Sequence, residues 1–113
     1  MSRFQIAQLD ALDAVECPCG RSRRAFTDDP DQIASVHLVD IAAKARSHYH
    51  KQMTEIYVVL QGEGTIELDG ESIPVWPMTA ILIKPGCRHR AVGEMRILNM
   101  VAPAFEEGDE FEN

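Results

Sequence analysis

The 113-residue sequence lacks any long apolar run. None of its apolar stretches approaches the ~20 residues that a membrane-spanning helix needs, so we expect no membrane partner. Residues 1–16 mix acidic residues into their apolar positions and lack the apolar region of a secretory signal. We therefore expect a cytoplasmic protein, and the length suits a single domain with one ordinary core.

Clustered basic residues are also missing. The chain has 11 Lys and Arg against 18 Asp and Glu, a formal net charge of −7. Binding to a phosphate backbone needs Lys and Arg gathered over one face, so we expect no nucleic-acid partner. Five of the acids fall in the last eight residues, namely Glu106, Glu107, Asp109, Glu110 and Glu112. Residues 105–113 are therefore predicted to be a solvated, frayed acidic tail, and deletion of residues 106–113 should leave stability almost unchanged.

Cysteines are few and odd in number: Cys17, Cys19 and Cys87. An odd count in a chain without an export signal argues against a disulfide framework. The Cys17-Pro18-Cys19 spacing matches neither a C-x-x-C redox pair nor half of a zinc ribbon. We expect free or buried thiols, with Cys87 either a bystander or a neighbour of the cavity discussed below.

Short strand-like segments separated by turn residues fill residues 33–104. The segments with strand-forming residues or period-two alternation are 33–43, 54–60, 65–68, 71–76, 79–84 and 95–101. Asp69-Gly70 is the strongest hairpin signal among them. This spacing predicts an all-β sandwich or barrel. Residues 1–32 are predicted to form an arm or loop packed on it, with a short helix or irregular arm over 4–16 and at most one short strand after that.

Two of the four histidines stand one residue apart, just before a strongly apolar run. Residues two apart in a strand point to the same face, so His48 and His50 should aim together. A tight connection over 51–54 would return Glu55 to the same neighbourhood, on an inward-facing row where a carboxylate needs a partner, commonly a cation. His89 follows another turn. Hydrogen-bonded surface histidines are the alternative, but four such residues together suit a first-row divalent metal.

The spacing His48-x-His50-x4-Glu55-x6-Gly62 resembles the first motif of the cupin superfamily, here a small single-domain member. The second cupin motif is matched in part, since Gly86 and His89 fit its G-x-x-H end. The chain departs from that motif at Met78, Lys84 and Gly93, positions that concern turn geometry and the barrel wall. The resemblance spans roughly residues 33–102. It implies a double-stranded β-helix (jelly-roll) barrel, often a homodimer, with a metal held by His48, His50, Glu55 and His89.

The resemblance leaves the metal open among iron, manganese, nickel and zinc. It implies either a metal-dependent enzyme acting on a small anionic organic molecule, dioxygenase-like or isomerase-like, or a non-catalytic cupin that binds or senses a small ligand. A structural module with a vestigial site is a third reading, disfavoured because all four ligand residues are present. Tyr57 is the candidate acid–base residue. Tyr57 and Val59, on the Glu55 row, are also candidates for the cavity wall, and plain core packing is the alternative for both.

Arginines near the N-terminus supply a further hypothesis. Guanidinium groups bind carboxylate or phosphate in a bidentate manner, so Arg21 and Arg23, which share one face of an extended segment, are candidate substrate-binding residues. Arg24 would point to the opposite face. The alternative is that these are surface arginines that balance an acidic chain. Trp76 is interpreted as a lid or wall residue, or as packing.

Overall fold

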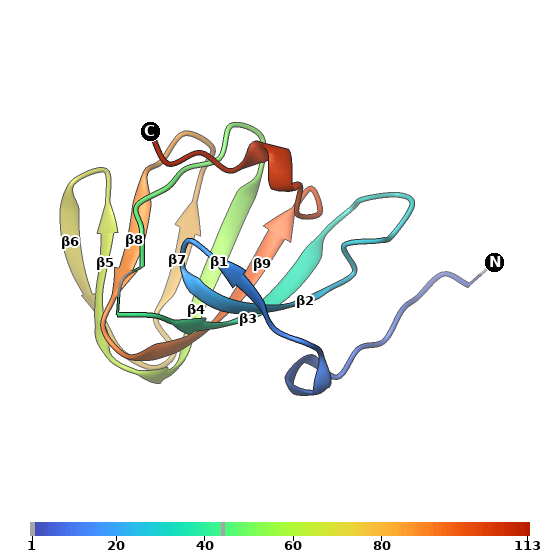
Figure 1. The fold of residues 1–113 in the computed structure, drawn as a ribbon, viewed down its shortest axis with the longest axis horizontal. Coiled ribbons are helices and arrows are strands. Elements are labelled where there is room, and N and C mark those ends of the chain that lie inside the picture. The colour runs from blue at the N-terminus through green and yellow to red at the C-terminus, as the bar shows by residue number, and fades with distance from the viewer. Residues whose placement is uncertain (1, 44) are drawn as a thin grey trace.

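The computed structural model describes residues 2–43 and 45–113, which fold into two antiparallel β-sheets that face each other (Figure 1). The larger sheet has the strand order β1-β2-β3-β9-β4-β7, and the smaller has the order β6-β5-β8. The strands are β1 (Val15–Cys17), β2 (Gly20–Ala25), β3 (Ser35–Ile41), β4 (Thr54–Gly62), β5 (Gly64–Leu68), β6 (Glu71–Val75), β7 (Ala80–Ile83), β8 (His89–Val92) and β9 (Met95–Ala102). The prediction of an all-β jelly-roll barrel is confirmed.

Helical structure among the described residues is confined to two 3-10 turns, η1 (Leu9–Ala11) and η2 (Glu107–Asp109). Within the same residues there is no helix with the length and apolar character needed to cross a membrane.

Period-two alternation places the core and the site on the same inner faces. On β4, Glu55, Tyr57 and Val59 are buried while the residues between them are not. On β9, Met95, Ile97, Asn99 and Val101 alternate in the same way. The main apolar core consists of Tyr57, Val59, Ile66, Val75, Ile83, Ala91, Met95 and Ile97. The predicted inward row of β4, with a carboxylate at its start, is therefore confirmed.

Two turns fix the strand register. Leu68 pairs with Glu71, so Asp69-Gly70 forms a two-residue hairpin loop with positive φ at both positions (48° and 89°), as predicted. Gly62, which closes the first motif, has φ 79°, and a Cβ at this position would lie 2.0 Å from the carbonyl oxygen of Glu94. A side chain at residue 62 would therefore push the β4–β5 turn away from the β8–β9 turn.

The region before residue 33 contains more strand than the sequence predicted. β2 pairs with β3 along its whole length, from Gly20 opposite Ile41 to Ala25 opposite Val36, and β1 continues the sheet. The larger sheet thus extends back to Val15. Residues 4–14 form an extended arm interrupted by η1, and the N-terminal end reaches away from the barrel (Figure 1).

The prediction of free or buried thiols is wrong for two of the three cysteines. Cys17 and Cys19 form a disulfide, with their Cα atoms 5.2 Å apart. The β1–β2 connection is a tight turn in which Cys17 pairs with Gly20, and this turn brings both side chains to one side. Cys87 is a free thiol, partly buried against the core.

The acidic C-terminal segment is docked, so the prediction of a frayed tail is also wrong. The buried Asp109 carboxylate accepts hydrogen bonds of 2.8–3.0 Å from the backbone N–H groups of residues 51, 52 and 53. Phe111 forms an isolated β-bridge with Tyr49, and their rings stack with centroids 5.5 Å apart. The C-terminal segment therefore lies beside the segment that carries His48 and His50 (Figure 1).

We expect Asp109→Ala to lower the free energy of unfolding by about 2–3 kcal/mol, because it leaves three buried or partly buried N–H groups without their charged acceptor. Urea denaturation measures this change. Glu107→Ala is the matched control, since Glu107 is an exposed acid of the same segment. Equal stability of the two variants would contradict the docking.

The same contact predicts a dependence on pH. Burial alone would raise the pKa of Asp109, but the three amide contacts outweigh burial and hold the pKa below its ordinary value of 3.8. The contribution of Asp109 to the free energy of unfolding is therefore present above pH ~3.8. It is lost as the pH falls through the lower pKa that Asp109 has in the folded state. The stability difference between wild type and Asp109→Ala should shrink only in that acidic range.

Candidate metal centre

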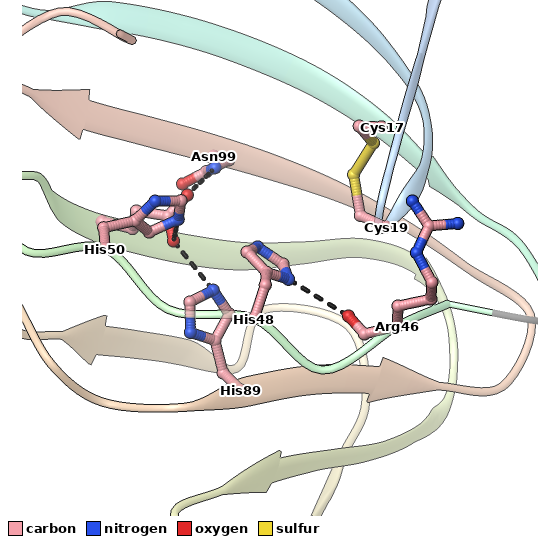
Figure 2. The surroundings of a disulfide bond; sticks show 8 residues. Cys17, Cys19, Arg46, His48, His50, His89 and Asn99 are labelled. Carbon is pink, nitrogen blue, oxygen red and sulfur yellow. Dashed lines mark hydrogen bonds and ion pairs between the residues drawn. A yellow bond between two sulfur atoms is a disulfide. The ribbon is translucent and has the colours of Figure 1, made fainter. Parts of the chain in front are cut away.

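Four buried side chains from both sheets converge inside the barrel. Glu55 begins the inner row of β4 in the larger sheet, and His89 begins β8 in the smaller sheet. His48 and His50 lie in the segment that leads into β4, and His48 forms a β-bridge with His89. The ligand atoms of all four residues lie within 4.8 Å of one another, and each residue is at most 4% exposed. Figure 2 shows the side chains of His48, His50 and His89 gathered in one place. The four residues that the sequence singled out are thus brought together.

Each imidazole is held through its Nδ1 atom by a backbone carbonyl. The partner of His48 is the carbonyl of Arg46 at 3.1 Å, that of His50 is Asp109 at 2.7 Å, and that of His89 is Cys87 at 2.9 Å. A carbonyl only accepts, so Nδ1 carries the proton and donates it in all three rings. In a ring that carries no second proton, the lone pair of Nε2 therefore points to the centre, as it does in metal-bound histidines.

In this tautomer the Nε2 atoms of the histidines are acceptors, and they face the Glu55 carboxylate, which is also an acceptor. The Nε2 atoms of His50 and His89 lie 3.1 Å and 2.9 Å from Oε1 of Glu55. All three atoms are buried, and none has a hydrogen bond of proper geometry from residues 2–43 or 45–113. Lone pairs at this separation repel unless a cation lies between them, either a proton on an imidazole or a metal ion. The donor set of three imidazoles and one carboxylate fits a first-row divalent metal.

The pKa shifts fit either kind of cation. Burial alone would lower the pKa of His50, but its contact with Glu55 outweighs burial and raises it, which favours a proton on His50 where no metal is bound. Burial alone would raise the pKa of Glu55, but the short contacts with His50 and His89 outweigh it and hold the pKa well below the ordinary range. Burial, followed by the neighbouring His89, lowers the pKa of His48 to about 4. At neutral pH the centre therefore offers a carboxylate and at least one neutral imidazole.

Two supporting residues escaped the sequence analysis. Nδ2 of Asn99 donates a 2.6 Å hydrogen bond to Oε2 of Glu55 and so orients the carboxylate (Figure 2). Asp109 supplies the carbonyl that holds His50. Asn99 could have been found as a polar residue on the inward row of a predicted strand. Asp109 gave no such signal, because its segment reads as solvated acid.

A small cavity of about 20 Å³ adjoins His48 and Glu55, with room for about one water molecule. Tyr57, the predicted acid–base residue, lines this cavity and packs its ring edge against His89 with centroids 5.8 Å apart. It also belongs to the core, so both roles considered for it are compatible with its position. Val59 is fully buried core, and Trp76 is 58% exposed, which makes it neither wall nor packing.

The fourth histidine, His37 on β3, lines the same cavity and was missed. Its Nε2 atom lies 2.9 Å from the Oγ atom of Ser35. Burial, then the charge of Arg24, lowers the pKa of His37 to about 4, so the ring is neutral at neutral pH. A histidine on the inward face of a predicted strand was the available signal.

The structure does not bring Arg21 and Arg23 to the cavity. Arg21 is exposed, and the guanidinium of Arg23 donates to the carbonyl of Leu12 in the N-terminal arm. The two share a face of β2, as predicted, but it is the outer face, and Arg24 is the arginine that lines the cavity. The arginines that flank His89 are also engaged elsewhere, Arg88 with the carbonyl of Glu112 and Arg90 with the carboxylate of Glu67.

Comparison with known proteins agrees with this geometry. The family model described as Cupin domain matches residues 36–100. A crystal structure of a protein from Planctomyces limnophilus is 45% identical and superposes with a TM-score of 0.89, covering 97% of each chain. No curated protein matches the sequence.

Two further solved structures share the fold at lower identity. Streptomyces Pac13, described as a nucleoside dehydratase and solved with uridine, is 21% identical with a TM-score of 0.81, covering 99% of this chain and 92% of its own. Ectoine synthase from P. lautus is 21% identical with a TM-score of 0.77, covering 97% and 90%. Because the cupin model spans more than half of the sequence, this chain belongs to the cupin family.

Proposed function

We propose that this cupin binds one divalent transition metal through His48, His50, Glu55 and His89 and catalyses a proton-transfer reaction, isomerase-like in type, on a small anionic organic molecule. The observation that supports it most is the set of buried Nε2 and Oε1 lone pairs that face one another across 2.9–3.1 Å. A bound iron, manganese, nickel or zinc ion would polarise an oxygen of the substrate as a Lewis acid.

The residues around the centre favour proton transfer over a dioxygenase-like reaction. Burial first, and then the charges of Glu55 and Glu110, raise the pKa of Tyr57 well above its ordinary value. Its phenol therefore stays protonated at neutral pH and can donate a hydrogen bond or a proton. The neutral His37 ring lines the same cavity and supplies a second group able to hold a proton.

The solved neighbours give modest support to an enzymatic role. Pac13 is described as a dehydratase and ectoine synthase as a synthase, so this barrel shape accommodates catalysis on small molecules. Their 21% identity with this chain transfers neither substrate nor mechanism.

We expect His48→Ala and His50→Ala each to reduce retained metal from near one equivalent per chain to below about 0.1, because each removes a ligand from the set. Elemental mass spectrometry of untagged protein measures this. His37→Gln is the control, since it replaces the remaining histidine of the barrel without touching the four ligands. Stoichiometric metal in both alanine variants would refute the ligand assignment.

Proton abstraction can be detected before the substrate is known. In D2O, metal-loaded protein should exchange carbon-bound protons of small hydroxy or keto acids for deuterium. Proton NMR measures the rate of this exchange. We expect Tyr57→Phe to slow this exchange about 100-fold, whereas Tyr49→Phe, at the tyrosine stacked on Phe111, should have no effect. Oxygen consumption without exchange would favour a dioxygenase, and neither signal would favour a binding protein.

The proposal includes a homodimer formed through the outer face of the larger sheet. On that face Ile56 lies opposite Leu82 on β7 and opposite Met100 on β9, and Leu82 is 58% exposed. β7 is also an edge strand of this sheet, with backbone groups available for pairing. A second copy would cover this row of apolar side chains.

We expect Leu82→Glu to convert the dimer into a monomer in sedimentation equilibrium, because the carboxylate would be buried in the interface. Ile73→Glu, at an apolar residue of the smaller sheet that is 40% exposed, should leave the dimer intact. A monomeric wild type would refute this part of the proposal.

A further inference from the structure

The inner face of β2 presents two polar groups to the cavity. Ser22 and Arg24 are two residues apart, so they share a face, and both line the cavity together with His48 and Glu55. Ser22 is only 1% exposed, yet its Oγ atom has no hydrogen-bond partner within the part of the chain that the structure describes. Nε of Arg24 is likewise buried and, among those residues, unpaired.

Both groups are positioned to donate. The guanidinium carbon of Arg24 lies 4.0 Å from the centroid of the Phe105 ring. Stacking uses the face of the guanidinium and fixes its plane, so the N–H edge stays available for an acceptor. Burial, the largest effect, lowers the pKa of Arg24, whereas the neighbouring carboxylates of Glu110 and Glu107 partly offset it, so the cation is partly desolvated. A hydroxyl and a desolvated guanidinium edge, both buried in one wall, match an anionic acceptor.

A larger pocket of about 240 Å³ adjoins the cavity, and its charged lining residues are four glutamates and two arginines, namely Glu16, Glu107, Glu110, Glu112, Arg24 and Arg46. The pocket and the cavity share Cys17, Arg24, Phe105 and Glu110. A molecule that enters through this pocket therefore meets Arg24 before it reaches the metal ligands.

The surrounding charge limits the kind of anion. Glu55 and Glu110 line the same cavity, so a phosphate dianion would meet stronger repulsion than a singly charged carboxylate. One hydroxyl and one N–H donor also correspond to the two oxygens of a carboxylate. A substrate that binds both this subsite and the metal needs a further oxygen outside its carboxylate. The His and Glu ligand set suits metals that also bind oxygen donors, so this further oxygen can bind the metal.

From these contacts we infer that Ser22 and Arg24 form a carboxylate subsite beside the metal ligands, and that the substrate is a small monocarboxylic acid with a hydroxyl or carbonyl oxygen for the metal. Because the cavity of about 20 Å³ has room for about one water molecule, binding of such an acid must widen it toward the neighbouring pocket. This inference rests on the proposed function for the role of the metal. The subsite itself consists of residues outside the ligand set. In this subsite Arg24, and not Arg21 or Arg23, is the substrate-binding arginine.

Glycolate is the probe, and glycolamide, its uncharged analogue, is the matched compound. Titrations of nitrogen-15-labelled protein, followed by amide chemical shifts, are run on metal-free and on zinc-loaded samples. We expect glycolamide to bind at least 10-fold more weakly than glycolate in both samples. Equal affinity for the two compounds would overturn the carboxylate assignment.

Variants on the two faces of β2 separate the subsite from general effects of charge. Arg24→Gln should weaken glycolate binding at least 10-fold, whereas Arg23→Gln, which removes the same charge one residue away on the outer face, should leave it unchanged. Equal losses in both variants, or none in Arg24→Gln, would overturn the inference.

Ser22→Ala gives a second measurement should Arg24→Gln not fold. Because the Ser22 hydroxyl lacks a partner within the described residues, its removal should not reduce stability, yet glycolate affinity should fall several-fold. Unchanged affinity in a folded Ser22→Ala protein would overturn the role of Ser22.

Zinc affinity, measured separately, distinguishes the two proposals. Failure of wild type to bind zinc, iron, manganese or nickel would refute the metal centre, while selective glycolate binding by metal-free protein would still support the subsite. Normal zinc affinity in Arg24→Gln with lost glycolate binding would support both.

Discussion

The contact of the Glu55 carboxylate with the imidazoles of His50 and His89 is the constraint on which the rest of the site depends. It joins β4 of the larger sheet to β8 of the smaller one inside the barrel, where water cannot screen it. Three backbone carbonyls fix the histidine tautomers, and Asn99 orients the carboxylate. These neighbours leave a set of lone pairs that a cation must satisfy, so the surrounding fold determines the chemistry of the centre.

The C-terminal segment belongs to this site although its composition is that of a solvated tail. The Asp109 carboxylate accepts hydrogen bonds from the three backbone N–H groups that follow His50. The Asp109 carbonyl accepts a hydrogen bond from the His50 ring. One residue thus holds both the backbone and the imidazole of a candidate metal ligand. Phe105 and Glu110, from the same segment, help to enclose the cavity. Stability of the segment and geometry of the centre are therefore coupled.

The two faces of β2 carry arginines with different roles, one structural and one at the cavity. Arg23 ties the N-terminal arm to the outer face through the Leu12 carbonyl, while Arg24 stacks on Phe105 at the cavity. The two side chains are adjacent in sequence and differ only in which face of the sheet they occupy. A similar division holds for tyrosine, since Tyr57 faces the cavity and Tyr49 stacks on Phe111.

The sequence by itself determined the features that depend on local geometry. Period-two alternation predicted the inner row of β4, Asp69-Gly70 predicted its hairpin, and the His48-x-His50-x4-Glu55 spacing predicted that these three side chains converge, because each signal involves residues close along the chain. The tertiary structure alone decided which segments meet. Asp109 reaches His50 across 59 residues and Asn99 reaches Glu55 across 44. The pairing of β2 with β3 selected Arg24 over Arg23, and the turn that precedes β2 joined Cys17 to Cys19, because strand partners and faces follow from the packing of the whole sheet.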